Sequence, residues 1–259
     1  MRFLLILSIF QLFASGVTAQ TDSLRAYMRD LVVKNQYGSL TEDELTDLRA
    51  YGYALQNKAL QFAETNKNDA EALSAADSAL QFWISIGETG HEANVSKLKG
   101  TLLGKQGETE DARSCLLRSA SLYESLQMGN GVAVAYYEMS VVLDQAGMTD
   151  SALWYQQQAA AYWLKQKETL KVVESNNQLI HLYRKLKRYE EGIKIQSATE
   201  KELTVEMHWR PVIDLYYVSY QLFRDAADQS KASLYLRLYN NWLNKLKEEG
   251  IVVISKYEK

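Results

Sequence analysis

The chain has 259 residues, and its 29 Lys and Arg against 32 Asp and Glu give a formal net charge of −3 at neutral pH. This balance gives no electrostatic reason to expect nucleic-acid binding, because phosphate recognition calls for a clustered basic surface. The single cysteine, Cys115, excludes an internal disulfide. Its place in an apolar column predicts a small, buried side chain.

The first 19 residues have the pattern of a secretory signal peptide. Arg2 supplies a positive charge, Phe3 to Phe13 form an apolar run, and Val17-Thr18-Ala19 form a small-residue cleavage site. We expect cleavage before Gln20 and therefore an exported mature chain, periplasmic or secreted, without a membrane span. A transmembrane helix over residues 3–19 is the alternative, although the run is shorter than the roughly 20 apolar residues that a span needs.

The segment 20–41 is predicted to hold a capping helix. Its helical pattern runs from Thr21 to Lys34, and its apolar side comprises Leu24, Tyr27, Met28, Leu31 and Val32. A helical array needs such a cap because its end exposes an apolar face. Thr41 and Glu44 then have capping-box spacing, which marks the start of the next helix.

Residues 42–249 repeat with a period of 40. A small residue recurs at Ala72, Ala112, Ala152, Gly192 and Ala232, and a large apolar residue recurs at Trp83, Tyr123, Trp163, Leu203 and Leu243. Each period holds two amphipathic stretches, which predicts one antiparallel helix pair per repeat. The pairs are expected to turn near residues 67, 107, 147, 187 and 227. Small residues suit positions where two helices cross closely.

The small columns resemble those of the tetratricopeptide repeat (TPR). Gly100 and Ser140 match the small position of the first helix, and Ala112 and Ala152 match that of the second. A later small position is matched by Ala79, Ser119, Ala159 and Thr199, and Tyr239 breaks it. The usual period of the family is 34 residues, so the chain looks most like the longer-helix variants of exported bacterial sensory and regulatory proteins. The resemblance implies an all-α, right-handed superhelical α-solenoid of about five antiparallel helix pairs.

The sequence contains no arrangement typical of catalysis. His91, His181 and His208 are scattered, with no second ligand three or four residues away, so we expect no metal site. Neither a glycine-rich phosphate loop nor a nucleophile elbow is present. We therefore predict a protein that is not an enzyme and has no cofactor.

Binding is predicted on the concave face, which the resemblance places along the first helix of each pair. Helical spacing selects as its main contact residues Asn94, Lys97, Tyr137, Asn177, His181, Arg184, Tyr217 and Arg224. Further positions on the same face are Thr101, Lys105, Val141, Asp144, Gln145, Lys185, Gln221 and Asp225. Asn, Arg and Tyr side chains suit an extended peptide or a partner helix. Ordinary solvated surface is the alternative interpretation.

The C-terminal tail, residues 250–259, begins with Gly250 and continues with the β-prone run Ile251 to Ile254. The run either folds back as an end cap or serves as an edge strand for a partner. The whole sequence thus favours an exported, non-catalytic scaffold that binds a protein or peptide partner in the cell envelope. A sensory or regulatory module that signals through a membrane partner is the second hypothesis.

Overall fold

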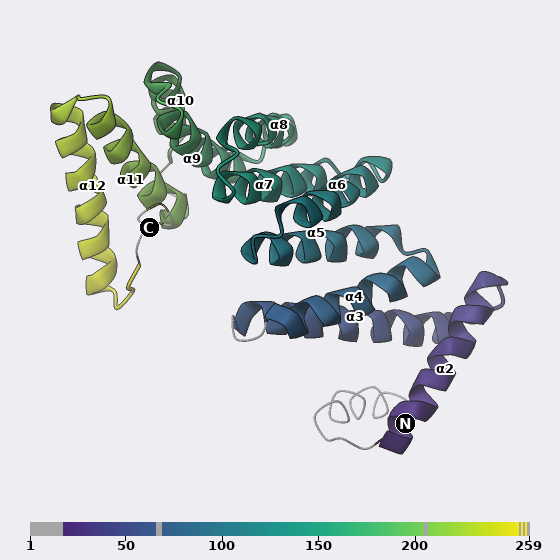
Figure 1. Ribbon diagram of the computed structural model, residues 1–259. Coiled ribbons are helices and arrows are strands. Elements are labelled where there is room, and N and C mark those ends of the chain that lie inside the picture. Colours follow the sequence, from purple (N-terminus) through teal and green to yellow (C-terminus); the bar gives the residue numbers. More distant parts are fainter. Residues whose placement is uncertain (1–17, 66–68, 205–206, 254, 256, 258–259) are drawn as a thin grey trace. The chain divides into compact units, whose positions relative to one another are not determined.

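A computed structural model describes residues 18–65, 69–204, 207–253, 255 and 257 of the chain. Within these residues the chain forms eleven α-helices, and Figure 1 labels them α2 to α12. They are α2 (Thr18–Gln36), α3 (Glu42–Thr65), α4 (Asp69–Ile86), α5 (Thr89–Lys105), α6 (Thr109–Ser125), α7 (Gly129–Gln145), α8 (Thr149–Gln166), α9 (Thr169–Lys185), α10 (Tyr189–Lys201), α11 (Trp209–Asp225) and α12 (Gln229–Glu248).

Most of the predicted signal peptide lies outside the described residues, which begin at Thr18. Thr18 and Ala19 form the start of α2. Among the helices of the described ranges, none is both long and apolar enough to cross a membrane.

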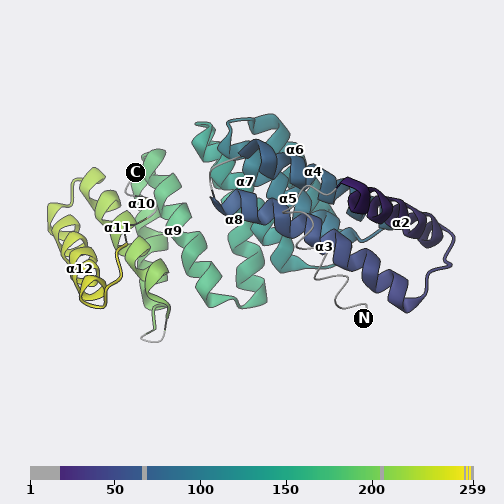
Figure 2. The ribbon, with the colours of Figure 1, turned by 90° about the horizontal axis from the view of Figure 1, so that it is seen from below.

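The chain divides into two compact units, residues 1–122 and residues 123–259, with the boundary inside α6. The first unit contains α2 to α5 and most of α6, and the second contains the end of α6 and α7 to α12. In the second unit, α9, α10, α11 and α12 lie side by side (Figure 2).

The predicted helix pairs are confirmed. They are α3 with α4, α7 with α8, α9 with α10, and α11 with α12. Helix α5 pairs with α6, where Ser119 Oγ donates to the carbonyl of Ala93 at 2.8 Å. The turns near residues 107, 147, 187 and 227 fall between the two helices of a pair, as expected. The turn predicted near residue 67 lies outside the described residues, although the helices on either side of it agree with the prediction.

The turns follow a finer spacing than the 40-residue period. A left-handed backbone conformation recurs every 20 residues from Gly87 to Lys187 and again at Ala227. The residues in this series are Gly87, Gly107, Gln127, Gly147, Lys167, Lys187 and Ala227. After each of these residues, the next N–H donates to a carbonyl five residues back, as in Glu108 to Leu103 (3.0 Å) and Arg188 to Tyr183 (2.9 Å). This is the Schellman arrangement, which satisfies carbonyls at the end of a helix.

The link between α10 and α11 departs from this spacing. Helix α10 ends at Lys201, and α11 begins at Trp209 after His208, whose Nδ1 accepts a hydrogen bond from the Arg210 N–H at 3.3 Å. Glu202 is exposed at this link, whereas the residues at the same position of the other pairs are large and apolar: Phe82, Leu122, Tyr162 and Trp242. The fourth pair therefore ends differently from the others.

The repeating columns form the core. All five residues of the small column are buried, and so are Trp83, Tyr123 and Trp163 of the large column. Leu203 and Leu243 are only half-buried. A Cβ on Gly192 would lie 2.9 Å from Leu222 Cδ1, which shows why a small residue is needed there.

In the first unit the core is organised around Trp83, which is fully buried. A Cβ on Gly52 would lie 2.5 Å from Trp83 Cη2, so the bare glycine backbone makes room for the indole. His91 stacks on the Trp83 indole with 4.2 Å between ring centroids, and Tyr53 Oη lies 3.1 Å from His91 Nε2. His91 thus has a packing role.

Helix α2 packs its apolar side into this core, where Met28 and Leu31 are buried. The predicted capping box follows it. The Thr41 N–H donates to Glu44 Oε2 at 2.9 Å, and the Glu44 N–H donates to Thr41 Oγ1 at 3.3 Å. The two residues together fix the start of α3.

Cys115 is a correction to the expected core. Its side chain is half-buried, not fully buried. It nevertheless lies deep enough that burial raises the pKa of its thiol. The column in which it stands faces the edge of the core at this repeat.

Candidate functional site

Two of the predicted contact residues, Asn94 and Lys97, lie on α5 in the first unit. Asn94 is exposed, and its Nδ2 donates to the carbonyl of Gly90 at 3.1 Å. Lys97 is half-buried. Both therefore have solvent-accessible side chains, whereas the other six predicted residues lie in the second unit.

Charged residues of neighbouring first helices pair with one another in the second unit. Asp144 on α7 lies 3.3 Å from His181 Nε2 on α9 and accepts a hydrogen bond from Lys185 Nζ. Asp225 at the end of α11 lies 2.9 Å from Arg184 Nη1 and 2.9 Å from Arg224 Nη2. The Asp144–Lys185 and Arg184–Asp225 pairs each span 41 residues, one repeat plus one residue.

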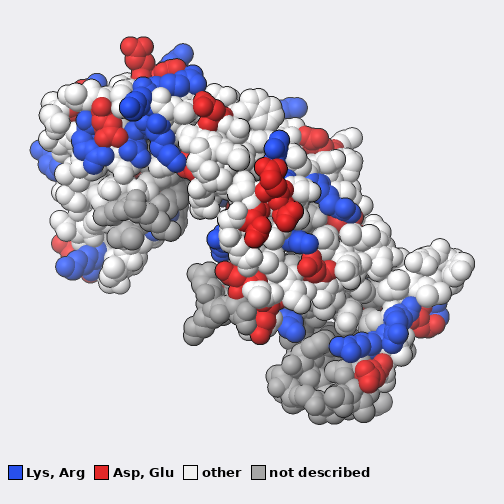
Figure 3. All heavy atoms as spheres, viewed as in Figure 1, with Lys and Arg blue, Asp and Glu red and all other residues white. Residues whose placement is uncertain are grey.

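These pairs set the protonation of the two carboxylates. Burial alone would raise the pKa of Asp144, but hydrogen bonds from His181 and Lys185 outweigh it and hold the pKa below its usual value. Burial is likewise outweighed at Asp225, where Arg184 and Arg224 lower the pKa. On the face shown in Figure 3, basic and acidic side chains are interspersed.

Asn177 is a correction to the predicted contact residues. Its side chain is 1% exposed, and its Nδ2 donates to the carbonyl of Pro211 at 2.8 Å. The reason is local, because α9 packs against the first turn of α11, and the Asn177 side-chain amide binds the Pro211 carbonyl of that turn. Asn177 therefore links two helices and is not open to a partner.

After α12 ends, Ser255 and Tyr257 of the C-terminal tail lie against α11, and Tyr257 also lies beside His181 of α9. Ser255 Oγ donates to Asp214 Oδ1 at 2.7 Å, and the Ser255 N–H donates to Tyr239 Oη at 3.1 Å. Gln221 Nε2 donates to the carbonyl of Tyr257 at 3.3 Å. The tail is thus held through both its backbone and its side chains.

The ring of Tyr257 is buried among apolar side chains of α9 and α11. It belongs to one cluster with Ile180, Leu215, Val218 and Leu222, and Tyr217 packs against that cluster. Its ring centroid lies 5.2 Å from that of His181. Burial raises the pKa of Tyr257 well above its ordinary value, and nearby ionisable groups, among them Asp214, Glu174 and Asp144, raise it further.

We call this surface the tail site and define it by His181, Asp214, Gln221, Tyr239 and the apolar cluster around Tyr257. Three sequence-predicted residues lie at it: His181 and Tyr217 by contact, and Gln221 by its hydrogen bond to the Tyr257 carbonyl. Tyr137 packs against Trp163, with 5.8 Å between their ring centroids. Arg184 and Arg224 instead gather around Asp225.

The prediction missed Asp214 and Tyr239, and the sequence holds a signal for each. Tyr239 breaks the later small position of the repeat, and its hydroxyl accepts the hydrogen bond from the Ser255 N–H. Asp214 stands between Ile213 and Leu215, so it is a buried acid within an apolar stretch of α11. Tyr239 thus departs from the repeat pattern and Asp214 from its apolar neighbours in the chain, and both lie where the tail is held.

Three polar side-chain atoms of α9 and α11 form no hydrogen bond with any described residue. Asn177 Oδ1, His181 Nδ1 and Gln221 Oε1 are buried and have no hydrogen-bond partner in the described part of the chain. A buried polar group left unsatisfied costs roughly 1 to 3 kcal/mol. The tail therefore leaves these three buried atoms unpaired.

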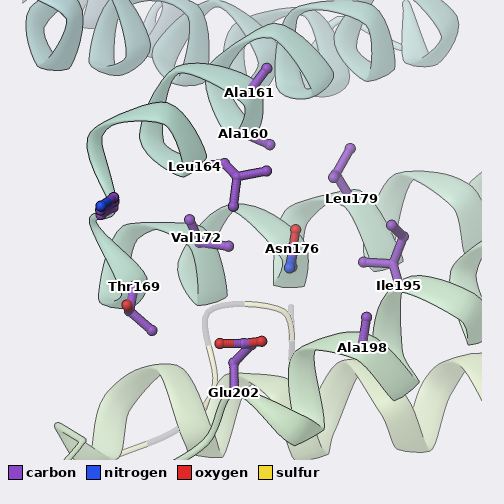
Figure 4. Close-up of a pocket in the computed structure, with 11 residues that line it drawn as sticks. Ala160, Ala161, Leu164, Thr169, Val172, Asn176, Leu179, Ile195, Ala198 and Glu202 are labelled. Atoms are coloured by element: carbon purple, nitrogen blue, oxygen red, sulfur yellow. The ribbon is translucent and has the colours of Figure 1, made fainter.

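A separate pocket of about 370 Å³ lies between α8 and α10, with α9 along one side (Figure 4). Its lining is mainly apolar, and Leu164, which contributes to it, is 68% exposed. The lining residues are Ala160, Ala161, Leu164, Lys167, Thr169, Val172, Asn176, Leu179, Ile195, Ala198 and Glu202. Within the described ranges, no group of three His, Cys, Asp or Glu residues is arranged to hold a metal ion.

No family model and no curated protein matches the sequence. Solved structures do match. BtubC (BKLC) from P. vanneervenii has a TM-score of 0.68 at 13% identity, with 93% of this chain and 97% of that chain covered. A putative kinesin light chain with nearly identical TPR-like repeats from Podosopora anserina has a TM-score of 0.63 at 12% identity, with 75% and 95% covered.

A third structure, a Rap protein complexed with Competence and Sporulation Factor, has a TM-score of 0.57 at 16% identity, with 80% of this chain and 67% of that chain covered. At these identities the likeness shows the fold alone. The chain therefore has an all-α, TPR-like repeat fold built from antiparallel helix pairs.

Proposed function

We propose that the protein is a non-catalytic TPR-like scaffold that binds a protein or peptide on the face of its first helices. One observation carries the proposal: this face holds residues 255 and 257 by backbone and side-chain hydrogen bonds and by a buried ring. Peptide-recognition surfaces combine these features, because main-chain bonds give affinity and side-chain pockets give specificity.

The structural comparisons support a binding role. The Rap protein that shares this fold was solved in complex with Competence and Sporulation Factor. Fold does not by itself determine function, so the proposal rests on the tail site and the neighbour only agrees with it.

We also propose that the protein is exported and meets its partner in the cell envelope, as the signal-peptide pattern of residues 1–19 suggests. Cleavage before Gln20 would remove only Thr18 and Ala19 from α2. Met28 and Leu31, which anchor α2 in the core, would remain. Loss of the signal is therefore compatible with the fold of the first unit.

A sensory or regulatory module that signals through a membrane partner is the second candidate. The pocket between α8 and α10 favours it, because its volume and apolar lining suit a small apolar ligand. A small molecule that raises the melting temperature of the parent, but not of an Ala160→Trp variant that fills the pocket, would support this alternative.

Affinity capture from an envelope extract tests the scaffold. The bait is the parent chain, and the test variant is Lys185→Ala with Arg224→Ala, two exposed residues on first helices. The matched control is Lys194→Ala with Arg237→Ala, which removes two exposed cations from second helices. Circular dichroism melts confirm that both variants fold.

The scaffold predicts a protein that the parent and the control retain and the test variant loses. An empty capture by all three chains would contradict the scaffold. Equal capture by all three would move the binding site away from the first helices.

A further inference from the structure

We propose that the tail site recognises a partner segment with a hydroxyl side chain two residues before an aromatic ring, and that the chain's own tail competes for this site from within. The inference rests on the proposed function, because it names the segment that the scaffold takes and its internal competitor. Ser255 and Tyr257 are the intramolecular stand-ins for that segment.

The hydroxyl position is selected by Asp214. Ser255 Oγ donates to this buried carboxylate at 2.7 Å, and hydrogen bonds to an ionised acceptor are stronger than neutral ones. An acidic or phosphorylated side chain would place a second negative charge against Asp214, which costs free energy. The site therefore favours an unmodified Ser or Thr.

The aromatic position is selected by the apolar cluster of α9 and α11. Tyr257 is buried there, beside the His181 ring and close to the charges of Asp144, Glu174 and Asp214. A neutral ring gains from this burial, whereas a phosphorylated ring would carry its charge into an apolar and acidic environment. The site thus favours Tyr or another uncharged aromatic residue.

The tail can be released without unfolding α12. Between the end of α12 and Ser255, Ile251 is exposed and Val252 is 89% exposed, and Val253 only partly packs against the cluster of Ile213 and Tyr239. A connection this short gives an effective concentration on the order of mM at the site. A partner segment must overcome this internal competition.

Fluorescence anisotropy with a labelled peptide of residues 250–259 tests the inference. The proteins are the full-length parent, Tyr257→Ala, and the matched control Val252→Ala, which changes an exposed tail residue. Tyr257→Ala should bind the peptide at least about tenfold more tightly than the parent and the control, because its own tail no longer competes. A peptide with Ser255→Asp or Tyr257→Ala should lose binding by at least about tenfold.

Failure of a folded Tyr257→Ala protein to bind the peptide would overturn the inference, and so would equal binding by Tyr257→Ala and the parent. If Tyr257→Ala does not fold, a full-length Ser255→Asp variant replaces it, since it keeps the ring and opposes only the contact with Asp214. Capture of an envelope partner without peptide binding leaves the scaffold standing and rejects the tail site. Peptide binding with an empty capture leaves the tail site standing and rejects the scaffold.

Discussion

Trp163→Ala is the sharpest test of the repeat register. Trp163 is 3% exposed and packs with Ala133, Ala159 and Tyr137, whose ring centroid is 5.8 Å away. A buried aromatic side chain removes roughly 150 to 250 Å² from water. At about 25 cal/mol per Å², this burial corresponds to roughly 4 to 6 kcal/mol. Alanine retains part of it and the site partly collapses, so we expect a loss of roughly 3 to 5 kcal/mol.

Urea unfolding followed by circular dichroism measures this loss without relying on the fluorescence of the removed ring. The control is Trp154→Ala on the same helix, because Trp154 is 52% exposed and the chemical change is identical. We expect the control to cost about 1 kcal/mol or less. A loss below about 1 kcal/mol for Trp163→Ala, or equal losses for the two variants, would refute the register.

The remaining predictions concern packing, charge and processing. Gly52→Ala should destabilise the protein by about 1 to 3 kcal/mol despite the better helix propensity of alanine, because its Cβ would meet the fully buried Trp83; thermal and urea unfolding measure this. Asp144→Asn should lower stability at neutral pH and flatten the acid limb of the stability profile. The depressed pKa of Asp144 contributes stability above the unfolded value of about 3.9, and that stability disappears as pH falls through the folded pKa. Urea midpoints of the parent and Asp144→Asn measured across this pH range test the prediction. If both proteins lose stability equally as the pH falls, the pairing of Asp144 with His181 and Lys185 is contradicted. N-terminal sequencing of protein from an envelope fraction should begin at Gln20, and an intact Met1 would count against signal cleavage.

The fold was predictable because the core is periodic. Every pair buries the small column, and the first three pairs also bury the large column. The weak copies of one pattern therefore add to a clear signal, and the helix pairs appear where the columns place them. Cys115 was misplaced because its column faces the core in some repeats and its edge in others. Such a column does not predict how deeply the side chain of one particular residue is buried.

The site was only partly predictable, because it depends on contacts outside the period. Helical spacing places Asn177 on the correct face, but it does not reveal that the first turn of α11 covers it. The return of Ser255 to Asp214 is a single long-range contact with no repeated counterpart. The Asp144–Lys185 and Arg184–Asp225 ion pairs could have been predicted, since both join opposite charges 41 residues apart on the predicted face.

The 20-residue step between left-handed turn residues makes the chain sensitive to length in some places and tolerant in others. One residue inserted within a helix turns every later side chain of that helix by about 100°, which carries core residues toward solvent. An insertion beside Gly107, Gly147 or Lys187 leaves the faces of both neighbouring helices unchanged. Gain and loss of residues during divergence of such chains should therefore concentrate at the turns, while the helices keep a constant length.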